Sequence, residues 1–369
     1  MASIWDFARP HLRDLAVYEP GKPIEETARE LKVHPADIIK LASNENPLGP
    51  SPKALAAIRA ALQQAHLYPD GGGFHLCHAL ADRLRCGREN IILGNGSNEI
   101  IELLAHAFLK AGDEIITTEH AFIAYKLIAK LFGAGTIETR SQNYEQDLEA
   151  MLAAITPKTR LIFIPNPNNP TGTLASQEKI DGFMARVPEN IITVFDEAYF
   201  EFLDHPPDTS RYVREGRNIM VLRTFSKIHG LAGLRVGYGI APPELIEVLQ
   251  KARQPFNVNG LGQIGAVAAL DDETHQVETK RVVDEGRAYL ERQFAAMQLD
   301  FVPSVANFVM VKVGDGAGVF KEMLVRKIIV RPLKGYGLAE WLRISVGTMP
   351  QNEQCIAALK DVLSKHRAL

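Results

Sequence analysis

Four polar segments of the sequence carry side chains that could do chemistry, and each follows a short apolar run. They are Gly94–Glu99 (GNGSNE), Asn166–Gly172 (NPNNPTG), Asp196–Tyr199 (DEAY) and Thr224–Lys227 (TFSK), with Arg235 eight residues after the lysine. The first opens a helical pattern, where backbone amides and the helix dipole can hold a phosphate. Because loops at the carboxyl ends of strands form ligand sites in open α/β sheets, we expect these segments to meet.

Taken one at a time, these segments have ordinary structural explanations. Glycines join strands to helices, Asn and Pro favour turns, an acid at a strand end is commonly an ion pair or a cap, and a lone lysine is commonly solvated. Their combination indicates a binding site for a cofactor. A phosphate cradle, an amide-rich turn, a carboxylate and a lysine with a following arginine suit a charged heteroaromatic phosphate whose aldehyde forms a Schiff base with lysine, namely pyridoxal 5'-phosphate.

Other kinds of site match the sequence poorly. The segment Gly94–Glu99 has a glutamate where a dinucleotide fingerprint needs its third glycine, and no P-loop ending in Gly-Lys-Ser/Thr occurs. A cluster of histidines and cysteines has no standard zinc spacing. It consists of His75, Cys77, His78 and Cys86. The G-x-S-x-G elbow of α/β-hydrolases is also missing. We therefore expect no metal site.

The four segments need a scaffold that alternates strands with helices. Short apolar runs rich in β-branched residues predict strands, and several are continuously hydrophobic, as parallel strands covered on both faces are. The predicted strands are Ile91–Gly94, Glu114–Thr118, Thr136–Arg140, Leu161–Pro165, Ile191–Asp196, Ile219–Phe225 and Val236–Ala241. Between the first two, apolar residues from Ile100 to Phe108 recur with helical spacing. This alternation is typical of an α/β domain with a mostly parallel sheet.

The C-terminal part of the chain follows a different pattern. A long charged helical stretch, Glu273–Met297, precedes strand patterns at Ala306–Val313, Lys327–Arg331 and Trp341–Val346, and a final helix is predicted over Gln351–His366. This order predicts a smaller α+β domain joined through a long helix. The predicted divisions are an N-terminal segment packing on the small domain (1–40), a large cofactor-binding domain (41–265) and the small domain with its connecting helix (266–369).

Composition limits the class of protein. The chain has 369 residues, 46% hydrophobic and 23% charged, so it is globular and long enough for about two domains. A formal net charge of −3 offers no basic surface for nucleic acid, and no run of about 18 apolar residues could span a membrane. The N-terminus lacks the apolar core of a signal peptide, and the three cysteines form no C-x-x-C pair. We expect a cytoplasmic protein that binds neither nucleic acid nor membrane.

Nearly the whole chain resembles the fold-type I pyridoxal-phosphate aminotransferases, and within them the histidinol-phosphate aminotransferases. The marks of the resemblance are YEPGKP from Tyr18, LASNENPLGPSP from Leu41, YPD from Tyr68, GNGSNE, NPNNPTG, DEAY, TFSK, GLAGLRVGYG from Gly230, ANF from Ala306 and LRISVGT from Leu342. The cofactor segments are specific to the superfamily, whereas SNENPLGPSP and LRISVGT narrow the resemblance to the family. It implies a three-layer large domain with a mostly parallel seven-stranded sheet, beside the smaller α+β domain.

The resemblance implies roles for the residues around the cofactor ring. Lys227 would hold the cofactor and, once released by the substrate amine, would move the substrate proton. Asp196 would pair with the pyridine nitrogen and keep it protonated, so that the ring accepts electrons. Asn169 and Tyr199 would hydrogen-bond the ring hydroxyl oxygen, and Phe122 would stack on the ring, where many relatives carry tyrosine. Lys227, Asp196 and Tyr199 are thus the expected catalytic residues.

The resemblance also assigns the cofactor phosphate. Its expected partners are the amides of Ser97 and Asn98, the hydroxyls of Thr224 and Ser226, and the guanidinium of Arg235. Tyr68 matches a residue that reaches the phosphate of the partner subunit, which implies a homodimer with shared sites. Asn98 stands where an acidic residue is common, which puts the rigidity of the amide turn in doubt. Leu67 stands where arginine is frequent, which puts an interface or anion contact in doubt.

Substrate residues are also implied by the resemblance. Arg343, in LRISVGT, is the expected anchor for both the glutamate carboxylate and the phosphate of an amino alcohol phosphate, because a guanidinium can bind either anion. Arg331 and Tyr18 resemble additional phosphate contacts, although Arg331 alone could be a solvated charge at a strand end. Asn46, in SNENP, completes the expected substrate-binding set.

The resemblance implies a homodimeric aminotransferase that converts L-histidinol phosphate and 2-oxoglutarate to imidazole-acetol phosphate and glutamate. Three alternatives stay open at this point. An aromatic amino-acid aminotransferase could use the same residues for phenylalanine or tyrosine, and a decarboxylase of the same fold could act on a substrate such as threonine phosphate. The fold also serves as an effector-sensing domain of transcription regulators, but the sequence contains no basic helix for DNA.

Overall fold

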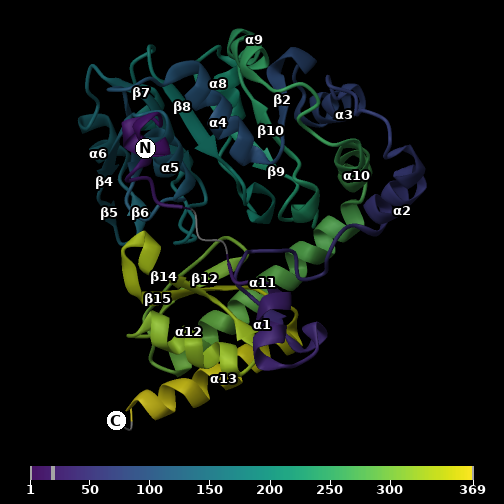
Figure 1. The fold of residues 1–369 in the computed structure, drawn as a ribbon, viewed down its shortest axis with the longest axis vertical. Helices are drawn as coiled ribbons and strands as arrows, with labels where there is room; N and C mark the ends of the chain where they lie inside the picture. Colours follow the sequence, from purple (N-terminus) through teal and green to yellow (C-terminus); the bar gives the residue numbers. More distant parts are fainter. Residues whose placement is uncertain (1, 18–20, 368–369) are drawn as a thin grey trace.

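The computed structural model describes residues 2–17 and 21–367, which form a large domain and a smaller one (Figure 1). The large domain contains the strands predicted from the middle of the sequence, and the small domain contains the C-terminal strands. The long helix α11 (Glu273–Ala296) connects the two. In the part of the chain that is described, no helix is both long and apolar enough to cross a membrane.

A seven-stranded sheet in the order β2-β10-β9-β8-β7-β3-β4 forms the centre of the large domain. Its strands are β2 (Ile91–Gly94), β3 (Glu114–Thr118), β4 (Gly135–Thr139), β7 (Thr159–Pro165), β8 (Ile192–Asp196), β9 (Ile219–Thr224) and β10 (Gly237–Ile240). β10 runs antiparallel to both of its neighbours, and the other pairs are parallel. The expected mostly parallel sheet is therefore confirmed, with each strand close to its predicted bounds.

Helices cover both faces of this sheet. Successive strand residues point to opposite sides, and the strands carry apolar residues on both sides, so both faces must be covered. On β9, Val221 joins one apolar core, whereas Met220 and Leu222 join the other. The first core is closed by α3 (Phe74–Leu84), α6 (Leu148–Ala153), α7 (Gln177–Met184), α8 (Ser210–Arg214) and α10 (Gly260–Leu270). The second is closed by α4 (Ser97–Phe108), α5 (Ala124–Leu131) and α9 (Pro243–Ala252). The large domain thus has the three expected layers.

The small domain has a four-stranded sheet in the order β11-β12-β15-β14. Its elements are β11 (Phe301–Val302), β12 (Phe308–Lys312), α12 (Gly316–Val325), β14 (Arg331–Leu333), β15 (Leu338–Ser345) and α13 (Met349–Arg367). The long helix α11 and α13 pack with the sheet around Leu290, Phe294, Ile344 and Leu359. This is the α+β arrangement predicted for the C-terminal part.

The single strand predicted over 327–331 is divided in the structure. β13 (Ile328–Ile329) pairs in parallel with β1 (Ile39–Lys40), and β14 pairs antiparallel with β15. Val330 lies between them and is buried. The apolar residues around Val330 predict one continuous strand, because the periodicity of a sequence carries no information about a change of pairing strand.

The N-terminal segment contacts both domains, whereas the sequence analysis expected it on the small domain. α1 (Ile24–Leu31) packs against Ile329 and α12 of the small domain. The earlier residues lie against α5 of the large domain, where His11 bonds the Leu131 carbonyl at 2.9 Å and Lys130 donates to the Asp14 carbonyl. Figure 1 places the N-terminus beside α5. Hydrogen bonds at the C-terminal end of α5 thus hold the residues that precede α1, few of which are apolar and buried.

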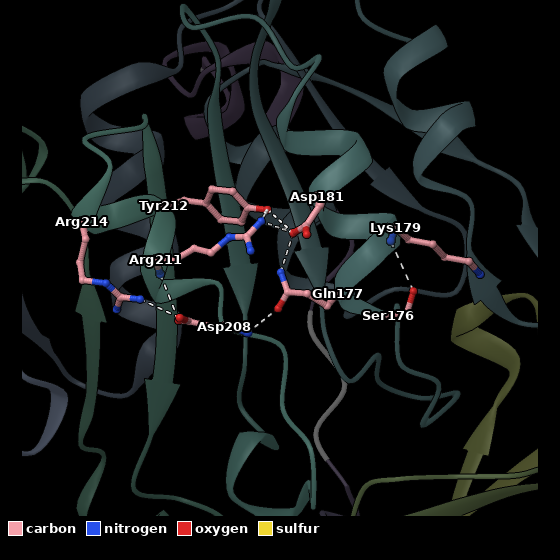
Figure 2. A network of polar contacts seen from close by, with 8 residues as sticks. All are labelled: Ser176, Gln177, Lys179, Asp181, Asp208, Arg211, Tyr212 and Arg214. Carbon is pink, nitrogen blue, oxygen red and sulfur yellow. Dashed lines mark hydrogen bonds and ion pairs between the residues drawn. The ribbon is translucent and has the colours of Figure 1, made fainter.

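A network of polar contacts joins α7 to α8 on the outer side of the large domain (Figure 2). Asp181 on α7 accepts hydrogen bonds from Gln177, Arg211 and Tyr212. Asp208 accepts from the backbone amide of Arg211 and from the Arg214 side chain. The network fixes the short loop before α8, and therefore the buried Thr209 that follows Asp208.

A buried ion pair continues this support toward the end of β8. Thr209 donates its hydroxyl proton to Glu197, and Glu197 also accepts from the Arg223 guanidinium at 2.9 and 3.0 Å. The side chains of Arg223 and Glu197 are only 8% and 2% exposed. Arg223 also lies over the Phe200 ring at 3.4 Å. The pair therefore holds the residue next to Asp196 in a single orientation.

We expect Arg223→Met to destabilise the cofactor-free protein by about 3–5 kcal/mol, because it leaves the Glu197 carboxylate buried without its cation. The matched control is Arg214→Met, which removes the exposed ion pair with Asp208 and should cost less than about 1 kcal/mol. Urea denaturation of both variants measures the difference. Equal losses would contradict a structural role for the buried pair.

Candidate active site

A cavity of about 270 Å³ opens at the carboxyl ends of β7, β8 and β9. The structure brings every expected cofactor residue except Tyr68 to its walls. They are Ser97, Asn98, Phe122, Asn169, Asp196, Tyr199, Thr224, Ser226, Lys227 and Arg235. These side chains come from loops far apart in the sequence, and parallel strands of similar length place those loops at one edge of the sheet.

The N-terminus of α4 forms one end of the cavity. Gly96 precedes the helix with φ +77°, a conformation that L side chains rarely adopt, so this turn favours glycine. A side-chain carbon on Gly237 would lie 2.2 Å from the Ser97 amide nitrogen, and one on Gly96 would lie 2.3 Å from the Arg235 guanidinium. The two glycines therefore allow β10, the N-terminus of α4 and Arg235 to pack closely together, which brings helix amides and a guanidinium, both suited to an anion, to one end of the cavity.

Two hydroxyl groups complete this anion cradle. The Thr224 hydroxyl donates to the Ser226 hydroxyl at 3.0 Å, and the Arg235 guanidinium donates to the same oxygen at 3.5 Å. Thr224 and Ser226 are both buried. Hydroxyls, helix amides and a guanidinium in one place suit a phosphate group.

Asp196 lies at the end of β8 with only one of its carboxylate oxygens bonded. Oδ2 accepts the Tyr125 hydroxyl at 2.6 Å, whereas Oδ1 is buried without a partner. Burial raises the pKa of Asp196, and the hydrogen bond from Tyr125, the backbone amide of Ala198 and the charge of Lys227 oppose that rise. A buried carboxylate oxygen that lacks a donor is costly, so this one is suited to a ligand that brings an N–H.

Tyr125 is a site residue that the sequence analysis missed. It is buried on α5 and stacks on Phe163 at a centroid distance of 4.6 Å. It stands three residues after Phe122, and therefore on the same side of the chain as it enters α5. This spacing was visible in the sequence, but nothing there indicated that its hydroxyl reaches Asp196.

Lys227 projects its amine into the same cavity. Nζ donates to the Ser43 carbonyl at 3.3 Å and lies 5.6 Å from the centre of the Tyr199 ring. Burial, together with the positive charges of Arg343 and Arg235, lowers the pKa of Lys227 to about 8, against the opposing effect of Glu45 and Asp196. Roughly a tenth of the amine is then neutral near pH 7, far more than for a solvated lysine.

Two arginines of the small domain lie side by side, and one of them contacts the wall of the cavity. Arg331 on β14 and Arg343 on β15 are directly opposite each other in the antiparallel pair, so both side chains leave the same face of the sheet. Arg343 is buried and donates to the Ala42 carbonyl at 2.6 Å and to Asn169 Oδ1. Because Asn169 lines the cavity, the hydrogen bond from Arg343 connects the cavity wall to the small domain.

Not all of the expected site residues line the cavity. Tyr68 is 84% exposed and stacks on Phe256 at 4.9 Å, outside this cavity. The Asn46 side chain donates to the Ile228 carbonyl at 2.8 Å and accepts from the Leu48 amide, beside the site rather than in its wall. Tyr18 lies outside the described residues. Their functional roles stay predictions.

The residues present fit pyridoxal phosphate. The cradle at α4 suits its phosphate, the unpartnered Asp196 oxygen suits the protonated ring nitrogen, and the partly neutral Lys227 amine suits its aldehyde. Phe122 offers an aromatic face in the same wall. Among the described residues, no group of three or more His, Cys, Asp or Glu side chains could hold a metal ion.

We expect Lys227 in the cofactor-free protein to lose its proton near pH 8. Solvated lysines should do so near pH 10.4, since burial does not disfavour their charged form. Competitive labelling with acetic anhydride across pH, read by peptide mass spectrometry, measures each midpoint. Arg343→Ala should raise the Lys227 midpoint because a repelling charge is removed. A midpoint above pH 10 in the unmodified protein would contradict this account of the amine.

Comparison with known proteins agrees with this geometry. A family model for aminotransferases of class I and II matches residues 36–359. The histidinol-phosphate aminotransferase of Akkermansia muciniphila is 53% identical over 364 residues, covering 98% of this chain and 100% of that protein. The enzyme of the same name from Moorella thermoacetica is 48% identical over 360 residues, covering 96% and 93%.

A solved structure shares the fold over nearly the whole chain. The histidinol-phosphate aminotransferase of Sinorhizobium meliloti, crystallised in complex with pyridoxal-5'-phosphate, superposes with a TM-score of 0.87 at 27% identity. The match covers 96% of this chain and 97% of that one. Because the family model and the relatives span most of its length, the chain belongs to the class I and II aminotransferases, and within them to the histidinol-phosphate aminotransferases.

Proposed function

We propose that this protein transfers the amino group of L-histidinol phosphate to 2-oxoglutarate, reversibly, giving imidazole-acetol phosphate and glutamate in histidine biosynthesis. The observation that carries the proposal is the partly buried Lys227 amine, with its lowered pKa, in one cavity with an unpartnered Asp196 oxygen and an anion cradle. The full-length similarity to histidinol-phosphate aminotransferases supports the choice of substrate.

Pyridoxal phosphate, when bound, supplies an aldehyde that captures amines and a ring that accepts electrons from the amine-bearing carbon. The protein supplies positioning and proton transfer. Lys227 Nζ, neutral in part near pH 7, would be the base that takes the proton from the amine-bearing carbon of the substrate and delivers it to the carbon of the cofactor aldehyde. Asp196 Oδ1 would hold the positive charge on the ring nitrogen, and Tyr125 keeps Asp196 in place through Oδ2.

The two arginines support the proposal that one site accepts two substrates with different anionic groups. Glutamate brings a singly charged α-carboxylate, whereas histidinol phosphate lacks that group and brings a phosphate with nearly two negative charges at pH 7. Arg343, which lies next to Asn169, is placed to hold either anion near the cavity. Arg331, directly opposite on β14, supplies the second positive charge that a phosphate uses and a carboxylate needs less.

We propose that the active protein is a homodimer. A second, mostly apolar hollow of about 1010 Å³ lies between α2 (Pro52–Ala61) and α10, and contains Tyr68 and Phe256. Leu67 and Tyr68 are 62% and 84% exposed there. Large exposed apolar surfaces mark interaction sites. A second copy of the chain would cover this hollow and bring Tyr68 to the cradle of its partner.

The cytoplasmic location expected from the sequence also belongs to this proposal. All three cysteines, Cys77, Cys86 and Cys355, are free thiols in the structure. Free thiols are typical of proteins in a reducing compartment.

Arginine variants test the choice of substrate. We expect Arg331→Ala to lower kcat/KM for histidinol phosphate by about 10–100-fold, the effect of losing a charge-assisted hydrogen bond, with a smaller effect on glutamate. Arg343→Ala should impair both half-reactions. Steady-state kinetics with histidinol phosphate, glutamate and phenylalanine measure these differences in each variant and in the unmodified protein.

The unmodified protein provides the reference for these measurements. A preference for phenylalanine over histidinol phosphate of more than roughly tenfold, about 1.4 kcal/mol of transition-state binding, would favour an aromatic amino-acid aminotransferase. Release of carbon dioxide without consumption of a keto acid would favour the decarboxylase. Either result would replace the proposed reaction.

Leu67→Asp should convert the dimer to monomers, because it places a charge in the apolar hollow. It should also weaken cofactor retention, since Tyr68 then no longer reaches a partner. Sedimentation velocity and cofactor titration measure the two effects. Val325→Asp is the matched control, at an apolar residue 67% exposed on α12 and outside the hollow, and should stay dimeric. A fully active monomer would overturn the proposed assembly.

A further inference from the structure

Asn44 is a buried residue that holds the hydroxyl of Tyr199. It lies between β1 and α2, is 1% exposed, and has φ +54°, a left-handed conformation that asparagine tolerates better than most residues. Its side-chain Nδ2 donates to the Tyr199 Oη at 2.9 Å. Nothing in the sequence assigned a role to this residue, although it stands inside the SNENP motif.

The small domain decides which way the Asn44 amide faces. The Asn44 backbone N–H donates to Ser345 Oγ at 2.8 Å, and Ser345 Oγ lies 2.8 Å from Asn44 Oδ1, to which it donates. In this arrangement the single proton of the serine hydroxyl goes to the amide oxygen. The amide nitrogen therefore faces Tyr199. Asn307 on the loop before β12 donates to the Asn44 carbonyl at 3.0 Å and holds the backbone.

This arrangement fixes the direction of the Tyr199 hydroxyl. Because the Asn44 amide nitrogen can only donate, the Tyr199 oxygen accepts there and its own proton must go to another acceptor. Burial raises the pKa of Tyr199 to about 12, against the effect of Arg343 and of the Asn44 hydrogen bond, so the phenol keeps that proton at neutral pH. Tyr199 lines the cavity, and its proton is therefore available on the cavity side.

We propose that Asn44 is a positioning residue that makes Tyr199 a hydrogen-bond donor toward the cofactor ring, and that Ser345 sets this polarity from the small domain. The inference rests on the proposed cofactor chemistry. Ser345 lies two residues after Arg343 on β15, so the strand that carries the substrate anchor also orients the donor to the cofactor.

The test is a pH titration of the visible absorption of the holoprotein, in which the cofactor is bound to Lys227. In Asn44→Asp the carboxylate accepts the Tyr199 proton, so the ring oxygen loses its donor and the nitrogen that joins Lys227 to the cofactor becomes more basic. We expect the midpoint to rise by about 1 pH unit, the size of one hydrogen bond to a charged group. Ser345→Ala should shift it in the same direction by less.

A double-variant cycle distinguishes positioning from general disruption. Tyr199→Phe should raise the midpoint by itself, and adding Asn44→Asp or Ser345→Ala to it should produce no further shift. Asn90→Asp is the matched control, since Asn90 accepts from the Gly87 amide and donates to the Ala241 carbonyl away from the cavity. It should lower the Tm and leave the midpoint unchanged.

Two outcomes would overturn the role of Asn44. One is an unchanged midpoint in Asn44→Asp and Ser345→Ala holoproteins, and the other is a shift that persists in full in the Tyr199→Phe background. If Asn44→Asp does not fold, Ser345→Ala and Tyr199→Phe complete the same cycle. Absence of the visible band in the unmodified protein, by contrast, would overturn the proposed function itself.

Discussion

Two ionisable groups, the Asp196 carboxylate and the Lys227 amine, are held out of water in one cavity, and much of the large domain serves to keep them there. Burial disfavours the charge on each, which raises the pKa of Asp196 and lowers that of Lys227 to about 8. The shift of Lys227 suits catalysis because it leaves the amine partly neutral, and the unpartnered oxygen of Asp196 is open to a ligand that brings an N–H.

The support for these groups comes from a surrounding layer of buried polar contacts. Tyr125 bonds one oxygen of Asp196, and the ion pair of Glu197 with Arg223 fixes the next residue along the chain. Thr209 extends that support to the polar network between α7 and α8 on the outer side of the domain. A functional side chain is positioned well when its neighbours are themselves fixed, and here the chain of contacts reaches from the outer network to the cavity.

The small domain takes part in the same site through one strand. Arg343 and Ser345 are two residues apart on β15, so their side chains leave the same face of the sheet. Arg343 donates a hydrogen bond to Asn169, and Ser345 donates one to Asn44. Both contacts lead to residues that the family resemblance places at the cofactor ring, Asn169 directly and Tyr199 through Asn44. The proposed binding of a substrate anion by Arg343 and the proposed orientation of the Tyr199 hydroxyl therefore depend on the position of a single structural element.

The sequence by itself determined the strands of the large sheet, the long helix α11 and the four polar segments at strand ends, because apolar periodicity and turn residues are local properties. Tertiary structure alone decided that the strand predicted over 327–331 divides between two partners, and that the N-terminal segment contacts both domains. It also decided the roles of Tyr125 and Asn44, whose hydrogen bonds join residues 71 and 155 positions apart. Contacts of that kind depend on how the elements pack together, which no local pattern encodes.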